Sequence, residues 1–219
     1  MNELYRLAVG PLAWAAFILF VGGSACRLLM LVRLAWRKER FVFTYLSLRF
    51  GLRSIGHWLL PFGTATWRLH PWLTIVTFAF HACLVLTPIF LLAHVALVDE
   101  AWNVRWWSLP DGPAIATSLV VIGGCVFFFM RRRRLPEVAF VTSASDYVLL
   151  ALVAAPFVTG LLAYFQLGDV RVMTLAHILS GELMLAAIPF TRISHMLYAP
   201  LTRAYMGSEF GGVRHARDW

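Results

Sequence analysis

Four of the seven histidines in this chain lie inside long apolar stretches, where an ionisable side chain is costly and tends to serve a function. His177 and His195 are 18 residues apart, which on one continuous helix is about five full turns, so both rings would project from the same face. His81 and His94 are 13 residues apart in an earlier apolar stretch. Imidazoles that project from facing helices are typical axial ligands of haem iron. The histidines therefore predict b-type haem chemistry.

The spacing also predicts which histidines form pairs. His177 and His195 would be about 27 Å apart along their helix, and His81 and His94 about 20 Å apart along theirs. Each helix would therefore carry one histidine near either side of a membrane. If the two helices are antiparallel, His81 lies at the depth of His195, and His94 lies at the depth of His177. We expect two haem b groups, ligated by the pairs His81/His195 and His94/His177, with a single haem as the alternative.

The earlier histidine spacing fits this scheme less simply. Thirteen residues of ideal helix turn through about 220°, so His81 and His94 would not share a face. Pro88 lies between them and interrupts the hydrogen-bond ladder, and an overwound turn there would bring the two rings round. His70 is another candidate ligand, but it precedes Pro71 at the start of the apolar stretch, where a histidine needs no special role.

Three further ionisable residues lie in the apolar stretches close to these histidines. Arg27 and Arg192 are candidate cations for the haem propionates, and the alternative for each is that the side chain extends to the membrane interface. Glu182 follows His177 by five residues. It is a candidate for proton transfer at a quinone, or it pairs with a neighbouring helix.

The segments that position these residues are predicted to be transmembrane helices. Of the 219 residues, 60% are apolar and 14% are charged, against about 45–50% and about 25% in a soluble domain. The apolar residues fall in blocks of about 20, the length that spans a bilayer as a helix. We expect an all-α integral membrane protein, a single haem-binding helical bundle over residues 1–219. Five transmembrane helices are expected, over residues 9–33, 73–98, 114–130, 147–167 and 173–198.

The net charge of +8 is explained by membrane topology. With the N-terminus outside, all of the 19 Lys and Arg residues except Arg6, Arg105 and Arg171 lie on the cytoplasmic side or towards it. We therefore predict an N-out, C-in topology in a bacterial-type cytoplasmic membrane and no nucleic-acid partner. Residues 34–72 would form a cytoplasmic loop, in which a helix lying in the headgroup plane is a candidate.

The three cysteines do not predict a further metal site. Cys26, Cys83 and Cys125 lie in separate apolar blocks, and the sequence contains no CxxC pair. Neither an iron–sulphur site nor a structural zinc site is predicted in this chain.

Several motifs match the pattern of a known family. The most specific is His177 followed by Pro189-Phe190-Thr191-Arg192-Ile193-Ser194-His195. The others are Gly23-Ser24-Ala25-Cys26-Arg27, Trp36-Arg37, Phe80-His81, Arg131–Arg134 and Thr142-Ser143-Ala144-Ser145-Asp146. On these residues the chain resembles the cytochrome b (gamma) subunit of respiratory nitrate reductase and its relatives, and the similarity touches all five predicted helices.

The resemblance implies a quinol-linked dihaem cytochrome b that is an electron-transfer subunit and not an enzyme by itself. Its cytoplasmic face would dock an iron–sulphur subunit. The His81–His94 spacing is longer than in the nitrate reductase type and is more similar to small cytochromes b in the transmembrane redox complexes of sulphate reducers. Those cytochromes sit with heterodisulphide-reductase-like iron–sulphur subunits and often with periplasmic multihaem cytochromes c.

The outer electron donor remains open between two classes. One is a quinol, for which menaquinone is the candidate substrate and the edge of the outer haem near His94 the expected place. The other is a periplasmic cytochrome c. Two other functions are carried as alternatives: a transporter or proton channel that uses the histidines as a relay, and a haem-free membrane anchor. Transporters often show inverted repeats, which are not visible in this sequence.

Overall fold

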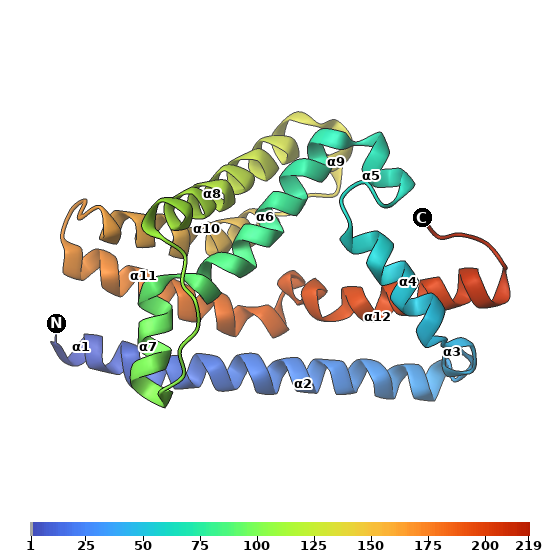
Figure 1. Cartoon of the computed structure of the whole chain (residues 1–219), viewed down its shortest axis with the longest axis horizontal. Coiled ribbons are helices and arrows are strands. Elements are labelled where there is room, and N and C mark those ends of the chain that lie inside the picture. Colours follow the sequence, from blue (N-terminus) through green and yellow to red (C-terminus); the bar gives the residue numbers. More distant parts are fainter. Residues whose placement is uncertain (1) are drawn as a thin grey trace. The chain divides into compact units, whose positions relative to one another are not determined.

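The computed structural model describes residues 2–219 as helices joined by short connections (Figure 1). These described residues contain no strand, only an isolated β-bridge between Leu91 and Leu109. Five helical segments among them are long and apolar enough to cross a membrane: Glu3–Lys38, Pro71–Phe90, Asp111–Arg134, Ala144–Tyr164 and Val170–Phe190. The predicted all-α membrane fold with five spans is confirmed at this level, whereas haem binding and the N-out orientation remain predictions.

The first span is longer than the predicted helix over residues 9–33. Helix α1 (Asn2–Leu7), the π-helical turn η1 (Ala8–Leu12) and α2 (Ala13–Lys38) follow one another without a gap. Pro11 lies in η1, where the wider turn accommodates a residue that has no N–H to donate. Three short helices occupy the predicted loop 34–72: α3 (Phe41–Tyr45), α4 (Leu48–Leu59) and α5 (Ala65–Leu69).

The third and fourth spans agree closely with the predicted helices over residues 114–130 and 147–167. They are α8 (Asp111–Arg134) and α10 (Ala144–Tyr164), joined by the short helix α9 (Pro136–Phe140). The predicted N-cap cluster at the start of α10 is present, since the backbone N–H of Ser143 donates to the Asp146 carboxylate at 2.8 Å. This contact satisfies a backbone donor that a helix start would otherwise leave unpaired.

The predicted helix over residues 73–98 is interrupted in the structure, which corrects the expectation of one continuous helix. Helix α6 (Pro71–Phe90) ends, Leu91 is extended with φ −68° and ψ 128°, and α7 (Leu92–Trp102) begins. Pro88 lies in the last turn of α6, where it has no N–H for the ladder and crowds the preceding turn. The overwound turn that would align His81 and His94 on one helix is therefore not needed, because the two histidines lie on different helices.

The predicted helix over residues 173–198 is also interrupted. Helix α11 (Val170–Ala187) continues as the 3₁₀ turn η2 (Ile188–Phe190), Thr191 is extended, and η3 (Arg192–Ser194) leads into α12 (His195–Ser208). Pro189 in η2 weakens the ladder for the same reason as Pro88. The expectation that His177 and His195 project from one face of a continuous helix is wrong, because the helix ends between them.

The described chain divides into two compact units. One comprises the described residues up to Thr74 together with Glu182–Trp219, and the other comprises Ile75–Gly181. The prediction of a single domain over residues 1–219 stays a prediction.

In the unit of residues 75–181, small residues allow close approach between helices. Phe80 of α6 is buried with its ring over Gly124 of α8, where a Cβ atom would lie 2.6 Å from Phe80 Cδ2. The Phe80 ring also contacts Phe128 edge-on, with ring centres 5.3 Å apart. Small residues at such contacts are typical of helix pairs in membranes, where packing replaces the hydrophobic effect. The contact fixes the part of α6 that carries His81.

In the other unit, α4 lies across α12 (Figure 1). A Cβ atom on Gly51 would come within 3.2 Å of the Ala204 Cβ, and Ser208 accepts a hydrogen bond from the Ser47 backbone N–H at 3.0 Å. Small side chains at the crossing therefore let the two helix backbones approach closely. Beyond α12 the chain continues as the π-helical turn η4 (Glu209–Val213) and then returns along α4.

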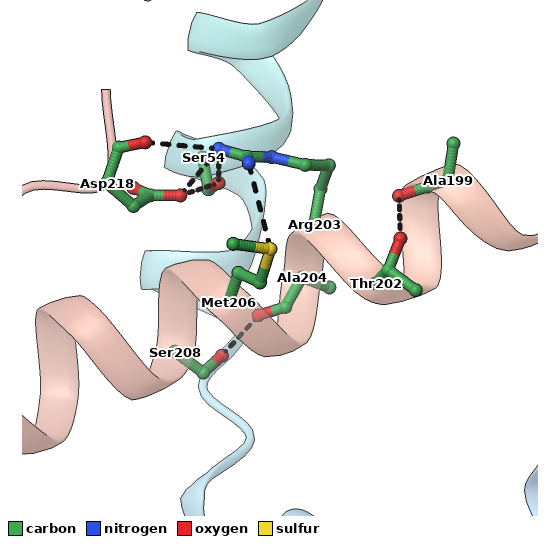
Figure 2. Close-up of polar contacts among 8 residues, drawn as sticks. All are labelled: Ser54, Ala199, Thr202, Arg203, Ala204, Met206, Ser208 and Asp218. Carbon is green, nitrogen blue, oxygen red and sulfur yellow. Dashed lines mark hydrogen bonds and ion pairs between the residues drawn. The ribbon is translucent and has the colours of Figure 1, made fainter. Parts of the chain in front are cut away.

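A buried ion pair ties this returning segment to the crossing (Figure 2). The Arg203 guanidinium on α12 donates to the Asp218 carboxylate at 2.7 Å and to the Ser54 hydroxyl at 3.1 Å. Ser54 on α4 also donates to Asp218. The side chains of Arg203 and Asp218 are only 15% and 3% exposed, so the pair is largely shielded from water.

Replacing Asp218 by alanine should loosen α4, because it leaves the Arg203 charge buried without its counter-ion at a cost of about 3–5 kcal/mol. Hydrogen exchange of the α4 backbone amides, followed by mass spectrometry in detergent, should then accelerate by about a hundredfold to several thousandfold. Glu209→Ala is the matched control, since it breaks the more exposed pair with Arg214, where the expected cost is about 0–1 kcal/mol. Equal exchange rates in the two variants would contradict a structural role for the buried pair.

Candidate functional site

The structure brings together one of the two predicted histidine pairs. The rings of His94 on α7 and His177 on α11 have centres 5.9 Å apart and planes inclined by 14°. Both residues belong to the unit of residues 75–181. They come from separate helices, as the two axial ligands of a haem in a helical bundle do.

The hydrogen bond that each ring makes shows which of its two nitrogens carries the proton. His94 Nδ1 lies 2.8 Å from the Pro88 carbonyl oxygen, and His177 Nδ1 lies 2.8 Å from the Pro156 carbonyl oxygen. A carbonyl oxygen only accepts, so Nδ1 carries the proton in both rings and Nε2 keeps the lone pair. Metal-ligating histidines are usually oriented in this way, with the other nitrogen bonded to a carbonyl or carboxylate.

The break between α6 and α7 supplies the carbonyl that orients His94. The last four carbonyls of a helix have no partner within it. At the end of α6, Thr87 O accepts from the Leu91 N–H, and Phe90 O accepts from the Leu109 N–H. Ile89 O accepts from Trp106 Nε1 at 2.9 Å, and Pro88 O accepts from His94. All four are therefore satisfied, and one of the four partners is the predicted ligand.

His177 reaches its carbonyl because a glycine faces it. A Cβ atom on Gly160 of α10 would lie 3.0 Å from His177 Nδ1 and 3.1 Å from Cε1, closer than side chains normally pack. Without that atom, the ring approaches the α10 backbone and donates to Pro156 O, one turn before Gly160. Gly160 is thus a positioning residue for His177.

The other two predicted ligands show the same local arrangement. His81 Nδ1 lies 2.8 Å from Thr77 O within α6, and His195 Nδ1 lies 2.9 Å from Arg192 O at the start of α12. Each ring therefore also keeps its lone pair on Nε2. The predicted pairing of His81 with His195 joins residues of the two units and stays a prediction.

The two predicted propionate cations lie at the break between α11 and α12. Arg27 Nε on α2 donates to Pro189 O at 2.9 Å, and α2 packs against η2 where Gly23 faces Pro189. The helix ladder does not use Pro189 O here, because the Ile193 N–H donates to the Thr191 hydroxyl instead. Arg192 is the first residue of η3, and its carbonyl orients His195. Their role toward propionates stays a prediction.

The residues around His94 and His177 fit a haem iron. A metal–imidazole bond is about 2 Å long, so two imidazoles on opposite sides of one metal ion have ring centres about 6 Å apart. The observed 5.9 Å agrees with this separation. In residues 2–219 no group of three or more His, Cys, Asp or Glu side chains is placed to hold a bare metal ion. A haem needs only the two axial ligands from the protein, because its porphyrin supplies the other four.

A cavity of about 340 Å³ lies along α7, next to the helix turn that carries His94. Its apolar wall is formed by Leu92, Val95 and Ala96. Its polar wall is formed by Asp99, Glu100, Asn103 and Arg105. The volume is in the range of sites for small organic molecules. The predicted quinone region near His94 and the following loop stays a prediction.

A protein from Nitratidesulfovibrio vulgaris (strain Hildenborough) is 37% identical to this chain over 211 residues, which cover 94% of this chain and 93% of that protein. The chain belongs to the same family as this protein. The relative bears no name beyond "Protein", so membership of this family assigns no activity. No protein-family model matches the chain. No solved structure matches it either.

Three contributors to the site were not predicted from sequence. Gly160 and the Pro156 carbonyl orient His177, and Trp106 holds the end of α6. A signal existed for part of this, because Pro88 and Pro156 mark places where a helix ladder is disturbed. Which donor would reach a given carbonyl depends on how the helices pack, and spacing along the chain does not reveal it.

Proposed function

We propose that the chain is a dihaem b-type cytochrome subunit that moves electrons across a membrane, from a donor on the outer side to a cytoplasmic iron–sulphur partner. The observation that carries the proposal is the His94/His177 pair. Its ring separation is 5.9 Å, and both Nδ1 atoms donate to backbone carbonyls, which leaves both Nε2 atoms as ligands. A transport relay or a bare anchor does not require this geometry.

When bound, haem iron supplies one-electron transfer between its ferric and ferrous states. The chain's own residues would hold and tune it. The Pro88 and Pro156 carbonyls fix the tautomer and the plane of each imidazole. His81 and His195 would hold the second haem, and Arg27 and Arg192 are proposed to face its propionates.

The topology is proposed from charge, and the partners are proposed from the resemblance. The Arg131–Arg134 run ends the span α8, and most other cations also belong to the side proposed as cytoplasmic. We place the N-terminus outside a bacterial-type cytoplasmic membrane. The relative comes from a sulphate reducer, the kind of organism whose small cytochromes b this chain resembles. This origin supports a heterodisulphide-reductase-like iron–sulphur partner over a nitrate-reductase-like one.

For the outer donor, the cavity along α7 favours a quinol over a periplasmic multihaem cytochrome c. An apolar wall suits the quinone ring and tail, and carboxylates are suited to accept the two protons that leave when a quinol gives up two electrons. We propose menaquinol as the substrate class and Asp99 and Glu100 as the proton acceptors.

The deciding experiment is a reduced-minus-oxidised spectrum with pyridine haemochrome quantification on the detergent-purified full chain. Two b haems per chain with low-spin bands would support both histidine pairs. One haem would retain the cytochrome proposal, and single His81 and His94 substitutions would then assign it. Protein made with sufficient haem that contains none would overturn the proposal and favour the transporter or the anchor.

Trp106→Phe tests how the outer site is held. The variant removes the N–H that satisfies Ile89 O at the end of α6, at a cost of about 1 kcal/mol, so α7 and His94 gain freedom. We expect both haems to be retained while the midpoint potential of the outer haem moves and that of the inner haem does not. A redox titration measures this, with Trp72→Phe as the control on an exposed tryptophan. An unchanged outer potential would mean that the contact does not position His94.

A further inference from the structure

Helix α4 has three distinct faces. At 100° per residue, Leu48, Leu52, Ile55 and Leu59 fall within an arc of about 60°. A second face, with Gly51 and Ser54, is buried against α12. A third face carries Arg49, Arg53 and His57.

The protein leaves most of the apolar face of α4 uncovered. Leu48 is 79% exposed, and Leu52 and Leu59 are each 59% exposed. The third face, in contrast, is partly covered by the returning segment. Trp219 stacks on His57 with ring centres 4.2 Å apart, and the Arg53 guanidinium lies 4.6 Å from the centre of the Trp219 ring. The fold thus covers α4 at Gly51 and Ser54 and partly at His57, and it leaves the leucine face exposed.

Two observations indicate that lipid is what covers the leucines. The exposed apolar surface of the span that contains α2 continues into α3, which precedes α4, since Leu34 and Trp36 near the end of α2 are 53% and 52% exposed and Phe41 in α3 is 53% exposed. The cation Arg49 flanks the leucines and is also exposed, which matches the negative charge of anionic phospholipids. With 12 residues, α4 is about 18 Å long, too short to cross a membrane.

We propose that α4 lies in the plane of the membrane surface, with Leu48, Leu52, Ile55 and Leu59 inserted among the acyl chains of an anionic phospholipid leaflet and Arg49 at the headgroups. An amphipathic helix in this position places its apolar face about 5–10 Å into the headgroup and acyl boundary. Because Asp218 and Trp219 hold the opposite side, α4 joins α12 rigidly to the leaflet. This proposal stands independently of haem.

Nitroxide labels on the full chain test the proposal, in a background where Cys26, Cys83 and Cys125 are replaced by alanine. Labels are placed at Leu48→Cys and Leu52→Cys on the leucine face. The matched control is Gly56→Cys, where a Cβ atom meets nothing within 4 Å and the residue is exposed. The protein is reconstituted in nanodiscs of phosphatidylcholine with phosphatidylglycerol, and collisions with oxygen and with a water-soluble nickel chelate are measured by electron paramagnetic resonance.

The expected result is that the labels at positions 48 and 52 collide readily with oxygen and several-fold less with nickel than the label at position 56. Nickel collisions as frequent as at position 56 would place the leucines in water and overturn the proposal. Labels shielded from both reagents would place them under protein, such as a second copy, and would overturn it as well. Leu48 is the more exposed of the two labelled leucines, so its replacement should affect folding least. The label at position 48 therefore keeps the test valid if the variant at position 52 does not fold.

Discussion

Alanine in place of His177 is expected to remove one of the two proposed haem groups and to leave the other bound. The His177 ring lies 5.9 Å from that of His94, and an iron between them would lose one axial ligand. The haem content per chain should fall by about half. His94→Ala should give the same loss, and the double variant should lose no more, because both residues serve one site. Pyridine haemochrome quantification per chain measures each value.

His70→Ala is the control for this series, because His70 is exposed in the described structure and precedes α6. It should retain both haems. Combining His177→Ala with His81→Ala should remove both, because these residues are assigned to different sites. Losses that add in the His94/His177 double variant would contradict the assignment of these two residues to one haem.

Leucine in place of Gly160 is expected to cause a loss of haem almost as large, although neither histidine ligand is replaced. The first atom of any side chain at this position would lie 3.0 Å from His177 Nδ1, and the rest of the leucine would push the ring away from the Pro156 carbonyl. Loss of a hydrogen-bond partner of a metal ligand typically lowers affinity by about 10–100-fold. The outer haem should therefore be lost selectively on dilution or during purification, as followed by its low-spin electron paramagnetic resonance signal.

Gly123→Leu is the matched control for Gly160→Leu. Gly123 also lies within a span, but it is exposed and a Cβ atom there meets nothing within 4 Å. This variant should keep both haems, and Gly160→Ala should show an intermediate loss. Equal haem content in the two leucine variants would show that close approach at Gly160 does not position His177.

The spans themselves could be predicted because their cause is local. A block of about 20 apolar residues has to satisfy its own backbone hydrogen bonds in lipid, and only a helix does so within one segment. The five predicted helices correspond to the five spans, and the predicted cap at Ser143 and Asp146 is present. The ends differ by several residues, since α1 and α2 extend the first span in both directions.

The two helix breaks could not be located from the spacing of the histidines. Both predicted ligand helices were treated as continuous, and the argument for a shared face of His177 and His195 depended on that continuity. Proline marked the region of each break, but a proline in a helix can also be tolerated, as Pro156 is within α10. The breaks at Leu91 and Thr191 are stable because side chains from other segments satisfy carbonyls that the ladder leaves open, Trp106 at the first and Arg27 at the second.

The sequence by itself determined the membrane class, the number of spans and the choice of His94 and His177 as partners, because each of these rests on residue type and on order along the chain. Only the tertiary structure decided how those partners are held. A hydrogen bond such as that from His177 to Pro156 O, or a close approach such as that at Gly160, joins atoms of different helices. Such contacts depend on the packing of whole helices, and neither hydropathy nor residue spacing encodes the distance between two helix axes.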